Sequence, residues 1–265
     1  MTNALRVLVV GAGWLGLPLA KAMAEAGHEV LVSNRSGASA AFTAAGGQVL
    51  ALDLDQAILP DLTSFELVVA SFPPAARGGN DGLYAQRLER LCEALSPQCR
   101  LVLVSSTSVY SQAPGMYNEN SEPLAEHAVR RGELAVLQHF PRALILRAGG
   151  LAGYDRLIGR YFSGRELVDP TQVVNLVHRD DAVGAALHLI AQGAQGCYNL
   201  VAPEHPTKAA VYATDLEALK LPPFVLSANR GEEAPRIISS DKLLATGYRF
   251  EHPNPLYFPR EKALG

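Results

Sequence analysis

Near its start, this chain of 265 residues reads Val7-Leu8-Val9-Val10-Gly11-Ala12-Gly13-Trp14-Leu15-Gly16. The apolar run predicts a buried strand, and the apolar residues that follow at helical spacing predict a helix. Between them, Gly11 allows a tight turn, Gly13 lets a phosphate approach the backbone, and Gly16 lets the helix pack closely on the sheet. The first N–H groups of such a helix bind phosphate. The stretch therefore predicts a dinucleotide-binding unit.

The end of the second predicted strand, residues 29–33, indicates which dinucleotide this turn would bind. An acidic residue about 20 positions after the glycines favours NAD, whereas an Arg there accommodates the 2′-phosphate of NADP. Here the strand is followed by Asn34, Arg35 and Ser36, with no acidic residue. The planar guanidinium of Arg35 suits a phosphate, and its neighbours can add hydrogen bonds. We expect the cofactor to be NADP, with NAD as the alternative. If Arg35 has no role in binding, it is a solvated arginine in a loop.

Composition limits the class of protein. Apolar residues make up 48% of the chain and charged residues 18%, so it can bury a large core. The net charge of −3 and the absence of a Lys/Arg block argue against nucleic-acid and membrane partners, and favour a small-molecule substrate. The three cysteines form no CxxC pair or metal-ligand cluster, which favours a reducing, cytoplasmic setting without a metal centre. A homodimer is the assembly left open.

Short apolar runs alternate with helical patterns, which is typical of a parallel sheet built from βα units. Strands are predicted at 5–10, 29–33, 48–51, 67–71, 101–105 and 143–147. Helices are predicted at 16–26, 39–45, 81–95, 123–139 and 182–191. We expect an α/β fold with a Rossmann-type doubly wound parallel sheet. Residues 1–150 would form the NAD(P)-binding domain, and 151–265 would complete the sheet and form a smaller C-terminal substrate-binding lobe.

Six further segments occur in a fixed order along the chain. They are Asp53-Leu54-Asp55, Ala70-Ser71-Phe72-Pro73-Pro74, Ser105-Ser106-Thr107-Ser108-Val109-Tyr110, Leu146-Arg147-Ala148-Gly149-Gly150, Asn175-Leu176-Val177-His178-Arg179-Asp180-Asp181-Ala182 and Gly196-Cys197-Tyr198-Asn199-Leu200. With the glycine turn, this ordered set resembles the extended short-chain dehydrogenase/reductases of the NAD(P)-dependent epimerase/dehydratase family over nearly the whole chain.

The resemblance implies where a dinucleotide would lie. Asp53 would lie at the adenine, Ser71 to Pro73 along the phosphates and ribose, and Gly149 near the nicotinamide end. The predicted cofactor-binding residues are therefore Gly11, Gly13, Trp14, Leu15, Gly16, Asn34, Arg35, Ser36, Asp53, Leu54, Ser71, Phe72, Pro73, Arg131 and Gly149.

The resemblance also implies catalytic positions, and here the chain departs from the family. Ser106 matches the Ser/Thr that hydrogen-bonds the reacting oxygen of the substrate. Sugar-nucleotide dehydratases carry an Asp-Glu pair next, where this chain has Thr107 and Ser108, so water elimination is disfavoured. No Tyr is followed four residues later by Lys, although the family's catalytic motif is Tyr-x-x-x-Lys. His127 and Arg131 stand at that spacing, which indicates an atypical member of the family.

Each remaining catalytic or substrate-binding candidate has a structural alternative. His127 could act as the acid, or it is an ordinary surface histidine. Tyr110 and Tyr117 are the competing acids, with a buried packing role open for Tyr110. For substrate binding we predict Thr107, Tyr117, Arg156 and His178, although His178 could instead bond a helix cap and Arg156 could be solvated.

Two functions remain in competition at this point. The first is an NAD(P)-dependent oxidoreductase or epimerase-like protein that acts on a small polar carbonyl or hydroxyl substrate, such as a sugar nucleotide. The second is a non-catalytic NADP-binding sensor or scaffold, which the missing Tyr-x-x-x-Lys motif favours. The retained segment from Ser105 to Ser108 favours the enzyme.

Overall fold

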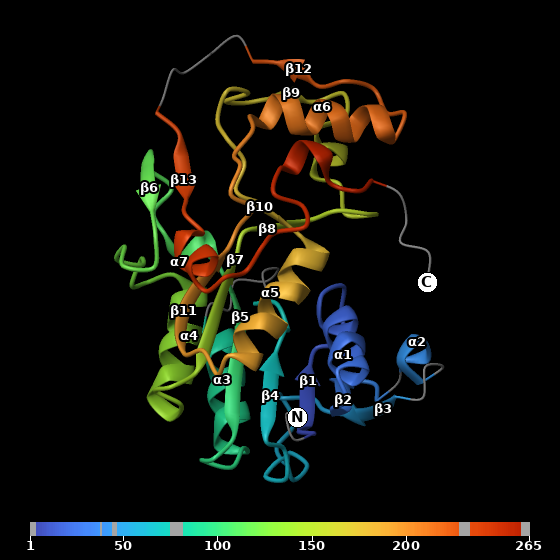
Figure 1. Cartoon of the computed structure of the whole chain (residues 1–265), viewed down its shortest axis with the longest axis vertical. Helices are drawn as coiled ribbons and strands as arrows, with labels where there is room; N and C mark the ends of the chain where they lie inside the picture. Colours follow the sequence, from blue (N-terminus) through green and yellow to red (C-terminus); the bar gives the residue numbers. More distant parts are fainter. Residues whose placement is uncertain (1–3, 38, 44–46, 75–81, 228–233, 261–265) are drawn as a thin grey trace. The chain divides into compact units, whose positions relative to one another are not determined.

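The computed structural model describes residues 4–37, 39–43, 47–74, 82–227 and 234–260. Seven strands form its central sheet: β1 (Arg6–Val10), β2 (Glu29–Asn34), β3 (Gln48–Ala51), β4 (Leu67–Ala70), β5 (Arg100–Ser106), β7 (Leu144–Ala148) and β11 (Gly196–Leu200). Their order across the sheet is β11-β7-β5-β4-β1-β2-β3 (Figure 1). The six strands predicted from the sequence are all present, and their ends agree within one residue.

The position of β1 creates the switch point of the sheet. β1 pairs in parallel with β2 on one side and β4 on the other, so the direction of the strand order reverses there. In an open parallel sheet, ligands bind outside the carboxyl ends of the strands at this point. The predicted Rossmann-type doubly wound α/β fold is confirmed.

The main helices of this layer are α1 (Gly16–Glu25), α3 (Leu83–Glu93) and α4 (Ala128–His139). α3 packs against α4, and their apolar side chains Tyr84, Leu88 and Val136 join one buried cluster with Leu8 and Val68 of the sheet. Because side chains alternate along a strand, Leu8 faces this cluster while its neighbours face the other side. No helix in the described part of the chain combines the length and apolar sequence needed to cross a bilayer.

Two predicted helices differ from the structure at their ends. α4 begins at Ala128 rather than Pro123, because His127 adopts an extended conformation and caps the helix. The helix predicted at 39–45 corresponds to α2 (Ala40–Thr43), whose predicted last two residues lie outside the described part of the chain. Asp81, the predicted start of α3, also lies outside it.

The chain forms two compact units whose segments alternate in the sequence. The first contains Met1–Val109, Pro123–Arg147 and Ala186–Cys197, and the second contains Tyr110–Glu122, Ala148–Ala185 and Tyr198–Gly265. Each unit thus takes residues from both sides of the single boundary predicted after residue 150. Helix α5 (Arg179–Ala191) passes from the second unit to the first.

The second unit consists of short elements, as expected for a segment rich in proline. Its strands form two-stranded parallel sheets: β6 (Gly115–Tyr117) with β13 (Arg236–Ile238), β8 (Gly150–Ala152) with β10 (Leu176–His178), and β9 (Glu166–Leu167) with β12 (Val225–Leu226). Its further helices are α6 (Lys208–Ala218), α7 (Asp241–Ala245) and the 3-10 turns η2 (Ile158–Phe162) and η3 (Pro255–Tyr257).

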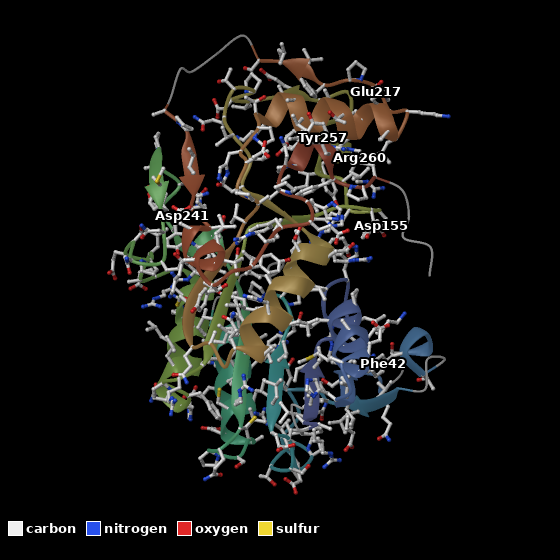
Figure 2. The ribbon with its side chains drawn as sticks, viewed as in Figure 1. Phe42, Asp155, Glu217, Asp241, Tyr257 and Arg260 are labelled. Atoms are coloured by element: carbon white, nitrogen blue, oxygen red, sulfur yellow. The ribbon has the colours of Figure 1, made fainter. Side chains whose placement is uncertain are left out.

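Arg260 anchors the end of the described chain to the second unit (Figure 2). Its Nε lies 2.9 Å from Oδ1 of Asp215 on α6, and both groups are almost buried. The other guanidinium nitrogens donate to the backbone oxygens of Pro255, Leu256 and Phe258. A guanidinium that uses several of its donors in this way fixes the local backbone firmly.

Candidate functional site

The glycines of the turn differ in what surrounds them. Gly11 has φ +105°, a conformation that side chains disfavour, and a Cβ on it would lie 3.0 Å from the backbone of Ser71 and Phe72. A Cβ on Gly16 would lie only 2.0 Å from the backbone oxygen of Gly11. A Cβ on Gly13 would meet no described atom within 4 Å. Gly11 and Gly16 thus serve the close packing of strand and helix, whereas Gly13 borders open space.

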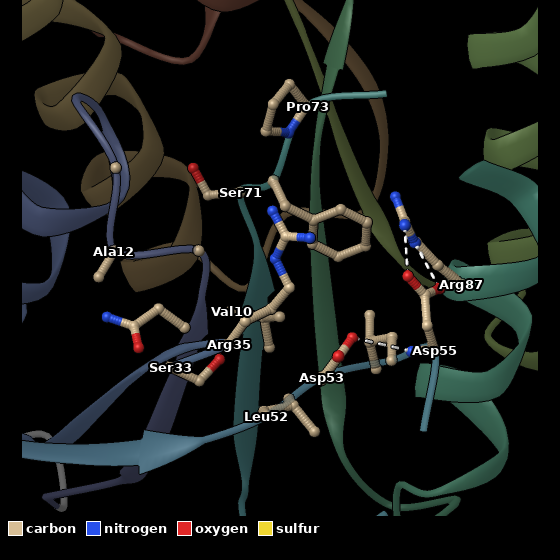
Figure 3. A pocket seen from close by; sticks show the side chains of 15 residues that line it. Val10, Ala12, Ser33, Arg35, Leu52, Asp53, Asp55, Ser71, Pro73 and Arg87 are labelled. Carbon is tan, nitrogen blue, oxygen red and sulfur yellow. Dashed lines mark hydrogen bonds and ion pairs between the residues drawn. The ribbon is translucent and has the colours of Figure 1, made fainter. Parts of the chain in front are cut away.

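That open space is a pocket of about 420 Å³ at the carboxyl ends of β1 to β4 (Figure 3). Among the predicted cofactor-binding residues, it is lined by Gly11, Gly13, Asn34, Arg35, Asp53, Leu54, Ser71, Phe72 and Pro73. It is also lined by Ser33, one of the residues near Arg35 that were expected to add hydrogen bonds, and by Val10, Ala12, Leu52, Asp55 and Arg87, which were not predicted. The switch point of the sheet, the glycine turn and the predicted residues therefore coincide.

Other predicted cofactor-binding residues lie outside the lining of this pocket. Leu15 and Gly16 are buried behind the turn, and Trp14 is half-buried. Ser36 donates a hydrogen bond to Oδ1 of Asn34, at 3.1 Å, and so orients a lining residue. Gly149 belongs to the second unit, where its N–H donates to the backbone oxygen of Leu200.

Arg35 and Asp53 provide opposite charges at the pocket. Arg35 is exposed, and Figure 3 shows its side chain extending from the end of β2 into the pocket. The carboxylate of Asp53 accepts hydrogen bonds from the backbone N of Asp55, at 3.1 Å, and from Nε2 of Gln56, at 3.3 Å. These bonds hold the Asp53 carboxylate in one orientation at the edge of the pocket.

Asp55 and Arg87 form a two-point ion pair on the wall of the same pocket (Figure 3). Nε of Arg87 lies 2.8 Å from Oδ1 of Asp55, and Nη2 lies 2.5 Å from Oδ2. Hydrogen bonding from Arg87 lowers the pKa of Asp55, and the nearby Arg35 adds to the shift. The sequence reasoning missed this pair because its members are far apart in the chain and Arg87 belongs to no motif.

Ser106 ends β5 and is half-buried. Its Oγ accepts a hydrogen bond from the backbone N of Ser108, at 3.1 Å, which leaves the hydroxyl proton for donation to another group. Thr107 begins the 3-10 turn η1 (Thr107–Val109) and is buried. The carboxyl end of β5 thus presents one oriented serine hydroxyl.

His127 and Arg131 occupy the spacing of the family's Tyr and Lys, but both have structural partners. His127 is the N-cap of α4, and its Nδ1 accepts a hydrogen bond from the backbone N of Val129, at 3.2 Å. Nη1 of Arg131 donates to the backbone oxygen of Glu126, at 3.0 Å, and lies 3.5 Å from its carboxylate. Helix capping therefore accounts for this histidine.

Tyr110 and Tyr117 belong to the second unit, and both hydroxyls are used within it. Tyr110 is completely buried and donates to Oδ1 of the buried Asn199, at 2.9 Å. Tyr117 donates to the backbone oxygen of Ala113, at 3.0 Å, and its ring centre lies 5.9 Å from that of Tyr110. Tyr110 thus has the packing role that the sequence left open.

His178 is completely buried, and its Nδ1 accepts a hydrogen bond from the backbone N of Asp180 at the start of α5, at 3.3 Å. This is the helix-cap alternative, and α5 begins at Arg179 rather than at residue 182, where the helix was predicted to begin. Burial lowers the pKa of His178 to about 4, so its ring is neutral near pH 7. Arg156, by contrast, is exposed in a turn with Gly153.

His178, Asp180 and His252 bring three potential metal ligands together. Both nitrogens of His178 are nevertheless obstructed. The Asp180 N–H lies on the Nδ1 side, and Gly153 is so close to Nε2 that a Cβ on it would lie 2.2 Å away. The His178 ring is therefore closely packed against protein atoms at both nitrogens.

A buried charge cluster in the first unit was not predicted. Glu133 of α4 has no exposed surface, and its carboxylate receives Nε and Nη2 of Arg147 at 2.8 and 2.7 Å. Ser105 Oγ donates to it at 2.6 Å, and Arg130 Nη1 at 3.0 Å. The available signal was helical spacing, because Glu133 shares one face of α4 with the buried residues Val129 and Val136.

Comparisons with known proteins agree with this fold. Protein YeeZ of Escherichia coli K12 is 32% identical over 275 aligned positions, which cover 97% of this chain and 99% of YeeZ. The structure of human epimerase family protein SDR39U1 with NADPH has a TM-score of 0.74 and 21% identity, covering 95% of this chain and 96% of that one. WbmG of Bordetella bronchiseptica with NAD and UDP has a TM-score of 0.72 and 17% identity, covering 96% and 91%. No protein-family model matches the chain.

The likeness to YeeZ extends over nearly all of both chains, and the solved structures share the fold. The resemblance to the extended short-chain dehydrogenase/reductases is confirmed for the fold. The chain therefore belongs to one protein family with YeeZ, and it has the fold of the NAD(P)-dependent epimerase/dehydratase class.

Proposed function

We propose that this protein is an NADP-dependent oxidoreductase of the epimerase/dehydratase type that acts on a small polar carbonyl or hydroxyl substrate, such as a sugar nucleotide. The observation that carries the proposal is the pocket at the switch point of the sheet, where the glycine turn and Arg35 meet. Two proteins of the same fold support it, since one was solved with NADPH and the other with NAD and UDP.

The preference for NADP over NAD rests on charge at the end of β2. Arg35 extends into the pocket there, and β2 ends without an acidic side chain that would repel a 2′-phosphate. Asp53 and Asp55 lie farther along, at the end of β3, and Asp55 is paired with Arg87. We assign the 2′-phosphate to Arg35, with the Asn34 amide, oriented by Ser36, as a neighbouring donor.

Replacement of Arg35 tests this assignment. A hydrogen bond to a charged group contributes about 1.5 to 3 kcal/mol, so Arg35→Ala should weaken NADPH binding about 10- to 150-fold and leave NADH nearly unchanged. Calorimetric titration of both cofactors measures the difference. Arg6→Ala is a matched control, because Arg6 lies at the amino end of β1 and pairs with Glu29. Equal losses for both cofactors in Arg35→Ala would disprove the assignment.

Bound NADP would accept or supply the hydride. The chain's contribution is to hold the substrate oxygen, and we assign this role to Ser106. Its Oγ accepts the Ser108 N–H, so its proton points elsewhere and is available to the substrate. His127 is the proposed second donor: when Nδ1 accepts the Val129 N–H, the ring carries its proton on Nε2 and can donate a hydrogen bond to the substrate oxygen.

The second candidate function is a non-catalytic NADP-binding sensor or scaffold. It is favoured by one observation, namely that the positions of the family's catalytic Tyr and Lys carry a helix cap and an arginine bound to Glu126. Under this proposal the pocket binds NADPH and the bound state, rather than a product, is the output.

A turnover assay separates the two candidates. Loss of one donor to a reacting oxygen costs on the order of 10²- to 10³-fold, so Ser106→Ala should reduce turnover by that factor while NADPH affinity is retained. Ser111→Ala is the control, because Ser111 lies in the next loop and belongs to the second unit. A wild-type protein that binds NADPH at micromolar concentration but turns over no carbonyl or sugar-nucleotide substrate would establish the sensor.

A further inference from the structure

We propose that the Asp55–Arg87 ion pair is a second determinant of NADPH preference, which acts by neutralising a carboxylate that would otherwise oppose the 2′-phosphate. The inference rests on the proposed binding of NADPH at this pocket. It assigns a specificity role to two residues that do not occupy the ribose-phosphate position themselves.

The geometry places two positive and two negative side chains at one pocket. Arg35, Asp53, Asp55 and Arg87 all line it, and the two arginines come from different elements, the end of β2 and helix α3 (Figure 3). Asp55 binds Arg87 at two points, at 2.8 and 2.5 Å. Both side chains keep some solvent contact, with 38% of Asp55 and 19% of Arg87 exposed, so their charges are only partly screened.

The charges also interact across the pocket. Arg35 adds to the effect of Arg87 in lowering the pKa of Asp55. The hydrogen bond to Asp55 raises the pKa of Arg87, and the charge of Asp53 adds to that shift. Without Arg87, the Asp55 carboxylate would compete with the 2′-phosphate for Arg35 and would repel that phosphate directly. Arg87 therefore keeps Arg35 available for the anion. NADH has no 2′-phosphate, so its binding should respond much less.

Arg87 also anchors the loop after β3, and this structural role must be separated from the electrostatic one. Arg90, one turn later on α3, supplies the control. Its Nη2 donates to the backbone oxygens of Gln56 and Ala57 in the same loop. Unlike Arg87, it binds this loop through backbone groups and not through a carboxylate. Because the charge of Arg90 also acts on Asp55, the control is Arg90→Lys, which keeps the charge but loses these guanidinium bonds. It should loosen the loop and weaken NADPH and NADH by the same factor.

The experiment compares the two single variants with the double variant. Calorimetry gives the dissociation constants of NADH and NADPH for each protein, and the quantity compared is the NADH constant divided by the NADPH constant. Interactions between partly exposed charges are modest, so Arg87→Ala should lower this ratio about threefold to fivefold. Asp55→Asn leaves the Arg87 cation unpaired and should raise the ratio about twofold to fivefold. The double variant removes both charges and should return the ratio to within about twofold of wild type. In 1 M salt the differences should shrink, because the screening length falls to about 3 Å.

The outcomes distinguish this inference from the function on which it rests. If Arg87→Ala and Asp55→Asn change both dissociation constants equally, as expected for Arg90→Lys, the pair only anchors the loop and the inference is overturned. In that case a selective loss of NADPH binding in Arg35→Ala would still uphold the proposed cofactor. If Arg35→Ala is also unselective, the proposed NADP preference fails as well.

Discussion

The pocket at the ends of β1 to β4 and the segment around α4 were both predicted from motifs, yet they differ in the structure. At the pocket, predicted residues such as Gly13, Arg35 and Ser71 line open space. Around α4, the predicted acid and its neighbouring cation are bonded to protein groups, His127 to the Val129 N–H and Arg131 to Glu126.

The two kinds of motif therefore carry different information. A glycine turn can be recognised from the residues themselves, because only glycine tolerates the close backbone contacts at Gly11 and Gly16. Here other residues stand at the positions of the Tyr and Lys in the Tyr-x-x-x-Lys motif, so the prediction of their role rests on spacing alone. Spacing does not reveal that the helix begins at Ala128, which makes the substituted residue a cap.

The largest effect is expected at the charge cluster that neither motif contains. Removal of one partner of a buried ion pair costs about 3 to 5 kcal/mol, so Glu133→Ala should lower the free energy of unfolding by that amount. Urea unfolding measures it. Glu126→Ala is the control, because its carboxylate is 95% exposed and its pairing with Arg131 should matter little. Similar losses in both variants would show that the α4 region is held by contacts other than this cluster.

The next largest effect is expected at Gly13, which borders the pocket. Gly13→Val adds a branched side chain where no described atom lies within 4 Å, so the protein should fold normally. The new side chain would occupy the space of the pyrophosphate and should weaken NADPH and NADH by more than about 100-fold. Gly16→Ala is the contrasting variant, since its Cβ clashes with Gly11 and should reduce stability instead. Normal cofactor binding by Gly13→Val would mean that the pocket binds something else.

A smaller effect concerns pH. The pKa of His178 is about 4 in the folded protein and about 6.5 when unfolded, so the neutral ring stabilises the fold fully above pH 6.5. This contribution, about 3 kcal/mol, is lost as the pH falls from 6.5 towards 4. The difference between the unfolding free energies of wild type and His178→Gln should therefore narrow over that range, whereas the exposed His139→Gln should follow wild type. An imidazole NMR titration near pH 6.5 would instead favour the predicted substrate-binding role of His178.

The smallest effect tests the capping role of His127. Loss of an N-cap costs about 1 kcal/mol, so His127→Ala should lower stability by that amount. His127→Asn keeps an acceptor for the Val129 N–H and should restore stability. Thermal or urea unfolding compares the two. If turnover is found and His127→Asn, though stable, has lost it, the side chain also serves as the hydrogen-bond donor proposed above.

Most of the fold could be predicted because its signals are local. Buried strands such as β1 and β4 are continuous apolar runs, and the glycines mark the first turn. The pairing of β6 with β13 could not be predicted, because strands of three residues are too short to show an alternating pattern of apolar residues. The two strands also lie more than 100 residues apart in the sequence. Asp55 with Arg87, and Glu133 with Arg147, escaped for a related reason: each pair joins different elements, and its members meet only once the sheet has formed.

The alternation of the two units along the chain has a consequence for biosynthesis. β7 ends at Ala148, but its outer neighbour β11 begins only at Gly196, after much of the second unit has been made. At synthesis rates of about 5 to 20 residues per second, β7 remains an uncovered sheet edge for roughly 2 to 10 s. An uncovered apolar edge is a site for intermolecular pairing. The emerging chain is therefore most prone to aggregate during this interval, and chaperones that bind apolar segments would act on it then.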